Sequence, residues 1–218
     1  MPDDLPVRFL ASLMCADPLR LEEEMQHLEQ AGVDGFHLDI MDAHFVPNLA
    51  LSWDTAARIA AAARVPVDLH LMIERPARFL ERVLRIRPAA VAIHPQPRKA
   101  LVEIARVLRG AGVAFGVAVA DVNDTMILSD ICPDYILCMT VQPGFAGQPF
   151  RADALLLAQA VQERCPGTPV WADGAIREDR AMKLRDEGVS GFVLGTSGLF
   201  RPDRDYEASL RIFRREVI

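Results

Sequence analysis

Short apolar segments alternate with longer amphipathic ones along almost the whole chain, and this alternation constrains the fold more than any other feature of the sequence. The apolar segments have the length and composition of buried strands, whereas the amphipathic ones have helical periodicity. Strands and helices that alternate in steps of about 25 residues are typical of parallel strands with right-handed crossovers. The predicted strands are residues 8–15, 35–41, 67–72, 89–94, 114–119, 135–140, 169–172 and 191–194.

The segments between these strands predict helices, and their boundaries carry residues that start and end helices. Pro18 and Pro76 lie at helix starts, where a missing N–H costs little. Gly32, Gly110 and Gly188 follow helical segments and suit the left-handed conformation that ends a helix. The predicted helices are residues 18–30, 53–63, 76–86, 98–109, 123–129, 152–164, 178–187 and 203–215. Eight such units in 218 residues favour an α/β fold, with residues 1–218 forming a single-domain (β/α)8 TIM barrel rather than an open sheet.

Composition and charge narrow the classes of partner. Apolar residues make up 51% of the chain and charged residues 25%, the balance of a soluble globular protein. A net charge of -6 gives no general electrostatic reason to bind nucleic acid or an anionic membrane. The first ten residues lack the basic and apolar regions of a signal peptide, and no apolar run reaches the ~18 residues of a membrane span. With four cysteines in no metal-binding spacing, the sequence predicts a cytoplasmic protein with reduced thiols.

Polar side chains lie near the ends of three predicted strands. His37 and Asp39 share one face of the second strand, because alternate residues of a strand point to the same side. Asp68 and His70 share a face of the third strand, and Asp173 follows the seventh. A single buried His or Asp is usually a structural core group. Several at the carboxyl ends of barrel strands, where such barrels place their active sites, favour a site for Zn²⁺, Mn²⁺, Fe²⁺ or Co²⁺.

Three glycine-bearing turns follow the last three predicted strands, at residues 142–148, 173–175 and 195–198. Free backbone N–H groups in such turns can hold a phosphate without a lysine. The alternative is that they are only tight connections, but three together favour a phosphate site. Methionines recur near the same strand ends, and we interpret them as core packing. These are Met14, Met41, Met72 and Met139.

At these positions the sequence resembles the ribulose-phosphate 3-epimerase family, and the similarity spans nearly the whole chain. The most specific phrase is HLDIMDAHFVPN at 37–48. The other matching phrases are SLMCAD at 12–17, HLM at 70–72, HP at 94–95, PGFAGQ at 143–148, DG at 173–174 and GTS at 195–197. Within the family, SLMC at 12–15, VPNLALS at 46–52, MTVQPGFAGQPF at 139–150 and GTSGLF at 195–200 resemble the branch that acts on D-allulose 6-phosphate, also called D-psicose 6-phosphate.

The resemblance implies an isomerase that epimerises a ketose phosphate at C3, with one divalent metal ion. Zinc is the first choice of ion, with Mn, Fe, Co and Mg as alternatives. The implied metal ligands are His37, Asp39, His70 and Asp173, of which Asp39 and Asp173 are also the two acid/base carboxylates. The implied substrate contacts are Ser12, His70, Gly144, Phe145, Ala146, Gly147, Asp173, Gly174, Ala175, Gly195, Thr196 and Ser197. The resemblance also implies a homo-oligomer.

Two rival functions stay open from the sequence: epimerisation of the shorter sugar D-ribulose 5-phosphate, and a non-catalytic barrel that binds a sugar phosphate. The second is disfavoured because both acid/base carboxylates are present. Four residues depart from the family pattern without removing a ligand. Gln96 and Gln142 replace Glu and Asn, while Ala43 and Ala175 replace glycines. The turn at Ala43 must therefore avoid a positive φ or accept strain.

Overall fold

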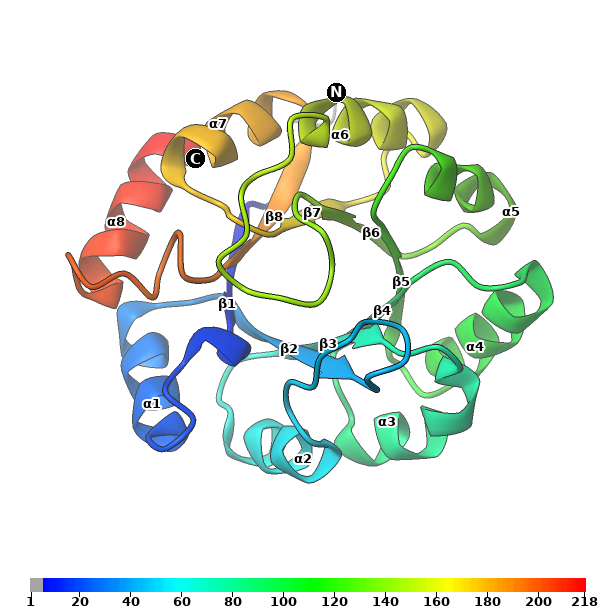
Figure 1. The fold of residues 1–218 in the computed structure, drawn as a ribbon, viewed down its shortest axis with the longest axis horizontal. Helices are drawn as coiled ribbons and strands as arrows, with labels where there is room; N and C mark the ends of the chain where they lie inside the picture. The colour runs from blue at the N-terminus through cyan, green and yellow to red at the C-terminus, as the bar shows by residue number, and fades with distance from the viewer. Residues whose placement is uncertain (1–5) are drawn as a thin grey trace.

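The computed structural model describes residues 6–218 as a closed barrel of eight parallel strands, paired in sequence order, with helices around the outside (Figure 1). The expected (β/α)8 TIM barrel is confirmed. The strands are β1 Arg8–Ser12, β2 Gly35–Met41, β3 Val67–Met72, β4 Ala90–Ile93, β5 Ala114–Val119, β6 Tyr135–Met139, β7 Val170–Asp173 and β8 Val189–Leu194. Within residues 6–218, none of the helices has both the length and the apolar character needed to span a bilayer.

The helices lie in the predicted segments, but several boundaries differ. The predicted helices at 76–86 and 123–129 both begin as 3-10 segments, and the helix expected to start at Pro18 starts at Leu21. Residues 13–15, expected to extend the first strand, form a 3-10 turn instead. The α-helices are α1 Leu21–Ala31, α2 Trp53–Ala62, α3 Leu80–Ile86, α4 Arg98–Gly110, α5 Leu128–Ile131, α6 Ala154–Arg164, α7 Glu178–Asp186 and α8 Tyr206–Val217. The 3-10 segments are Leu13–Cys15, Pro76–Phe79 and Asn123–Ile127.

Two of the three glycines expected to end helices do so. Gly32 follows α1 at φ 90°, and Gly188 follows α7 at φ 83°. The prediction for Gly110 is wrong, because this residue is still the last of α4 and the left-handed position falls on Gly112 at φ 75°. The C-terminal helix also begins later than predicted. Asp205 caps α8 by accepting a hydrogen bond from the Ala208 N–H, as expected of an Asp at a helix start.

The core has two parts because the two faces of each strand meet different surroundings. The outward faces pack against the helices in one large apolar cluster that includes Phe9, Phe36, Phe115 and Phe192. The inward faces carry smaller residues, chiefly alanines, around a few large side chains. Every residue of β2 is buried, His37 and Asp39 included. Since these polar residues point inward, they must find partners inside the barrel.

Both alanines that replace family glycines adopt a left-handed backbone. Ala43 has φ 59° in the loop after β2, and Ala175 has φ 51° in the turn after β7. Of the two outcomes expected for Ala43, the structure has the strained one, and Ala175 adopts the same conformation. A non-glycine residue in this conformation costs about 1–2 kcal/mol, so both loops keep a geometry that their own side chains disfavour.

We predict that Ala43→Gly stabilises the protein. Relief of the left-handed strain outweighs the greater freedom that glycine gives the unfolded chain, for a net gain of roughly 0.5–1 kcal/mol. The free energy of unfolding in urea measures this. Ala57→Gly is the control, because Ala57 is exposed on α2, where glycine costs about 1 kcal/mol. Destabilisation by both substitutions alike contradicts the prediction.

Candidate metal centre

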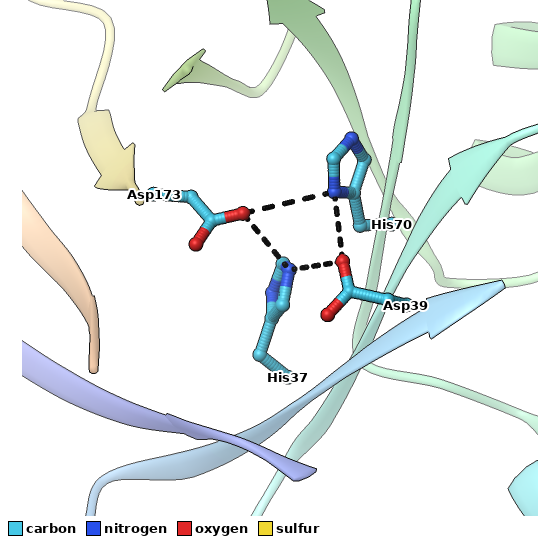
Figure 2. Close-up of side chains that lie close together, drawn as sticks. All are labelled: His37, Asp39, His70 and Asp173. Atoms are coloured by element: carbon cyan, nitrogen blue, oxygen red, sulfur yellow. Dashed lines mark hydrogen bonds and ion pairs between the residues drawn. The ribbon is translucent and has the colours of Figure 1, made fainter. Parts of the chain in front are cut away.

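Four side chains from three strands converge at the carboxyl end of the barrel. His37 and Asp39 come from β2, His70 from β3 and Asp173 from the end of β7, and they point toward one another (Figure 2). One possible ligand atom from each residue can be chosen so that all four lie within 4.8 Å of one another. Among residues 6–218 this is the only group of three or more His, Cys, Asp or Glu residues with such geometry. The cluster is able to hold a divalent ion.

Strand pairing explains why these residues meet. In the register between β2 and β3, His37 lies beside Asp68 and Asp39 beside His70. Each strand contributes its polar residues two positions apart, so all four side chains face the barrel interior. Asp173 reaches the same space from the far side of the barrel, at the last residue of β7.

The nitrogen atoms of the two histidines and the oxygen atoms of the two aspartates surround one common point. Nδ1 of His70 lies 3.1 Å from Oδ1 of Asp39 and 3.8 Å from Oδ2 of Asp173. Nε2 of His37 lies 3.5 Å from Oδ1 of Asp39 and 3.7 Å from Oδ2 of Asp173. This nitrogen is buried and has no hydrogen-bond partner among the described residues. An ion bound by the four residues satisfies it, so the donor set fits a metal such as zinc.

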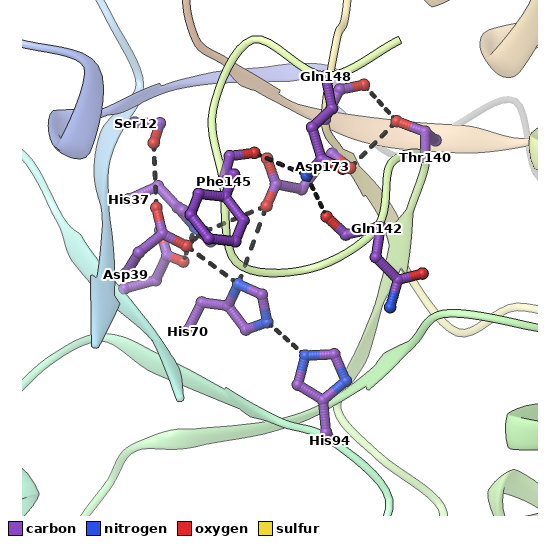
Figure 3. A network of polar contacts seen from close by, with 12 residues as sticks. Ser12, His37, Asp39, His70, His94, Thr140, Gln142, Phe145, Gln148 and Asp173 are labelled. Carbon is purple, nitrogen blue, oxygen red and sulfur yellow. Dashed lines mark hydrogen bonds and ion pairs between the residues drawn. The ribbon is translucent and has the colours of Figure 1, made fainter. Parts of the chain in front are cut away.

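His37 and His70 each use their second ring nitrogen to contact a residue outside the cluster. Nδ1 of His37 hydrogen-bonds Oδ2 of Asp68 at 2.6 Å. Nε2 of His70 hydrogen-bonds Nε2 of His94 at 2.9 Å (Figure 3). Such partners fix which ring nitrogen keeps its proton and which is free for an ion. His94 is the residue that sequence reasoning left aside. Its position at the end of the fourth predicted strand, like that of His37 and His70, was the available signal.

The two carboxylates of the cluster sit in different electrostatic environments. Burial opposes the charge of Asp39, but His37 and His70 hold the pKa of Asp39 well below its usual range. Burial raises the pKa of Asp173 to about 6 despite His37 and His70, with the charge on Asp39 adding to the effect. Asp39 also accepts a hydrogen bond from the Ser12 hydroxyl at 3.1 Å. Asp39 and Asp173, which both lie within 4 Å of Nε2 of His37, therefore have pKa values shifted in opposite directions.

A pocket above the cluster brings together most of the residues expected to touch a substrate. Ser12, Asp173 and all three glycine-bearing turns contribute to its lining. His70 and Ser197 do not line it: His70 is fully buried, and the pocket's contact with the turn after β8 is limited to Gly195 and Thr196. The four methionines that we assigned to core packing from the sequence all lie in the pocket wall, so that interpretation was incomplete. They are Met14, Met41, Met72 and Met139.

The loop between β6 and α6 crosses over the mouth of the barrel (Figure 1). Asn48 ties it to the loop after β2 by donating a hydrogen bond to the Gly144 carbonyl at 2.6 Å. Gln148 braces it from within by donating to the Phe145 carbonyl at 2.9 Å. Beneath this loop the cavity measures about 50 Å³, small beside the ~300–1,000 Å³ of typical ligand sites. Phe145, about half exposed, is the one large hydrophobic side chain of this loop that is exposed among the described residues.

Fold and cluster together define a (β/α)8 barrel with a His/Asp site for a divalent ion at the carboxyl ends of its strands. Residues 8–200 match the Ribulose-phosphate 3 epimerase family. The chain is 33% identical over 212 residues to ribulose-phosphate 3-epimerase of Mycobacterium tuberculosis, covering 94% of this chain and 91% of that one. It is 31% identical to ribulose-phosphate 3-epimerase of Treponema pallidum, covering 85% and 88%. The chain belongs to the ribulose-phosphate 3-epimerase family and is an isomerase of carbohydrates.

Solved structures share the fold at low sequence identity. The chain matches a mutant tryptophan synthase alpha-subunit from the hyperthermophile Pyrococcus furiosus with a TM-score of 0.69 at 13% identity, covering 98% of each chain. It matches a structure titled "Native KDPGal structure" with a TM-score of 0.68 at 14% identity, covering 95% and 93%. These likenesses concern the barrel alone.

Proposed function

We propose that this protein epimerises a ketose phosphate at C3 by proton transfer between two carboxylates, with D-allulose 6-phosphate as substrate. The observation that carries the proposal is the pair Asp39 and Asp173, which flank the buried Nε2 of His37 at 3.5 and 3.7 Å and open into one pocket. Inverting a carbon centre requires removing a proton from one face and returning one to the other. Two carboxylates on different strands can serve the two faces, whereas one cannot.

In the proposed mechanism His37, Asp39, His70 and Asp173 hold one divalent ion, with zinc preferred for its affinity for imidazole and carboxylate. When bound, the ion supplies Lewis-acid stabilisation of negative charge beside the reacting carbon. Asp39 takes the C3 proton from one face and Asp173 delivers a proton to the other, with the roles exchanged in the reverse reaction. Asp68 and His94 keep the two imidazoles in the tautomers that leave a nitrogen free toward the centre.

The methionines and the glycine-bearing turns serve the substrate in different ways. The methionine wall excludes water from the reacting carbons while adapting to the shape of the sugar. The turns at 144–147, 174–175 and 195–197 supply backbone N–H groups for the phosphate, which orient the ketose without taking part in the proton transfer. Because the cavity is smaller than typical ligand sites, we infer that the loop between β6 and α6 opens to admit the substrate.

Two sugars fit this proposal. The sequence phrases at 46–52 and 139–150 favour D-allulose 6-phosphate, which would be converted to D-fructose 6-phosphate. The names of the relatives favour the alternative, D-ribulose 5-phosphate, converted to D-xylulose 5-phosphate. Both use the same chemistry at C3, so the two carboxylates do not distinguish them. The self-association implied by the family resemblance remains a prediction.

We predict that Asp39→Asn and Asp173→Asn each lower kcat by at least about a hundredfold on either sugar, because each removes one of the two proton carriers. The substitutions keep side-chain size, so circular dichroism should match the parent protein. Asp54→Asn is the matched control, since Asp54 is exposed in the first turn of α2. Near-normal epimerisation by either cluster variant rules out the two-carboxylate mechanism.

We predict that a strong chelator abolishes activity and that added Zn²⁺, Mn²⁺, Fe²⁺ or Co²⁺ restores it. Metal analysis of the purified protein should find one ion per chain. The ion should raise the Tm of the parent protein, because a ligand that binds only the folded state stabilises it. His37→Ala should abolish the Tm shift. Full activity after verified removal of the ion excludes metal dependence while leaving the two carboxylates in place.

We predict that kcat/KM for D-allulose 6-phosphate exceeds that for D-ribulose 5-phosphate when both are assayed with the same metal-loaded preparation. A reversed preference assigns the shorter sugar and leaves the epimerase chemistry intact. No turnover of either sugar, with the ion present and the fold intact, supports the non-catalytic barrel instead.

A further inference from the structure

The barrel interior below the metal centre is built around two aromatic rings. Tyr135 at the start of β6 and Trp171 on β7 lie with their ring centroids 4.4 Å apart. Their partners on the adjoining strands are glycines: Gly116 lies beside Tyr135, and Gly191 beside Trp171. A Cβ atom at either glycine would overlap the neighbouring ring. Glycine at these two positions therefore leaves room for the two rings at the amino-terminal end of the barrel interior.

A cavity of about 230 Å³ opens at the amino ends of the strands, at the opposite end of the barrel from the substrate pocket. Its lining includes Tyr135, Trp171 and Asp68. Asp68 is thus shared between the two ends: one of its carboxylate oxygens holds His37 of the metal centre, and the residue also borders this lower cavity.

Two polar atoms in this region are buried without a hydrogen-bond partner among the described residues: the Tyr135 hydroxyl oxygen and Oδ1 of Asp68. The Tyr135 hydroxyl can donate a hydrogen bond, whereas the carboxylate oxygen of Asp68 can only accept one. Each atom could therefore serve as the other's partner. Both residues are about 97% buried, with 3% of their surface exposed. Both residues line the lower cavity. Burial raises the pKa of Tyr135 well above its ordinary value, and the negative charges of Asp68 and Asp134 add to the effect.

A tyrosine that only fills space does not account for this arrangement. Phenylalanine would fill the same volume against Trp171 and Gly116 without burying a hydroxyl that lacks a partner. The free oxygen of Asp68 also needs a donor, because the only ion pair of Asp68 among residues 6–218 is made by its other oxygen, with His37.

We propose that Tyr135 is a positioning residue whose hydroxyl donates a hydrogen bond to Oδ1 of Asp68, either after a small change in the χ1 angle of Tyr135 or through one water molecule from the lower cavity. With both oxygens engaged, the carboxylate of Asp68 is fixed in the plane that keeps Nδ1–H of His37 bound and Nε2 facing the cluster. The role of this relay in metal affinity rests on the proposed metal centre.

The test compares zinc affinity, measured by competition with a chromophoric chelator, across matched variants. Tyr135→Phe should weaken zinc binding by roughly tenfold, and Asp68→Asn by about 10- to 100-fold, as expected for residues that support metal ligands. Because Tyr135 acts through Asp68, the double variant should bind zinc no more weakly than Asp68→Asn alone. Ser209→Ala, which removes a similarly buried and unpartnered hydroxyl from α8, should leave zinc binding unchanged.

Measurements on the metal-free protein test the relay independently of the metal. Tyr135→Phe should lower the Tm and shift the NMR resonance of the His37 Nδ1 proton. A Tm that is unchanged or raised, with that resonance and the zinc dissociation constant both unchanged, overturns the proposal. A parent protein that binds no divalent ion refutes the metal centre, while the Tm and the proton resonance still decide the relay. A crystal structure distinguishes the direct bond from the bridging water.

Discussion

The register between β2 and β3 is the constraint on which the site depends. It sets His37 beside Asp68 and Asp39 beside His70, so two neighbouring strands supply three of the cluster's side chains and one of their supports. Alternate residues of a strand face opposite sides, and a slip of one residue would turn all of these groups toward the helices. The apolar residues between them prevent that slip, since Phe36, Leu38 and Ile40 pack in the outer core. The hydrophobic core thereby fixes where the polar chemistry lies.

The barrel interior changes in character from one end to the other. At the amino ends, two aromatic rings fill a floor that glycines and alanines on neighbouring strands make possible. At the carboxyl ends, imidazoles and carboxylates face one another beneath a wall of methionines. Asp68 joins the two regions, because its carboxylate holds His37 and borders the lower cavity. Burying this many polar groups inside the barrel is tolerable only because almost every one has a partner. Among the described residues, the unpartnered atoms on the strands belong to His37, Asp68 and Tyr135, and they point to the metal and to the proposed contact between Tyr135 and Asp68.

The loops at the carboxyl ends of the strands contain backbone conformations that are unfavourable for the residues they hold. Ala43 and Ala175 keep positive φ values that glycine would adopt without strain. Gly174 could not be replaced in the same way, since a Cβ there would overlap the side chain of Val141. The hydrogen bond from Asn48 to Gly144 joins loops that lie 96 residues apart in the sequence. Ala43 and Ala175 therefore tolerate backbone strain in loops at the mouth of the barrel, whereas at Gly174 a side chain is excluded by steric overlap.

Periodicity in the sequence was sufficient to determine the barrel, the order of its elements and the strand ends that carry His37, Asp39, His70 and Asp173. Those properties are local, because strand alternation and helix period depend on neighbouring residues. Sequence reasoning failed where contacts between distant segments decide the outcome. It missed the role of His94, underrated the four methionines, misplaced the left-handed glycine after α4 and gave no sign that Tyr135 and Asp68 line the same cavity. Only the closed barrel brings residues such as Asp68 and Tyr135, 67 positions apart, into one buried space, where each polar atom must find a partner or an ion.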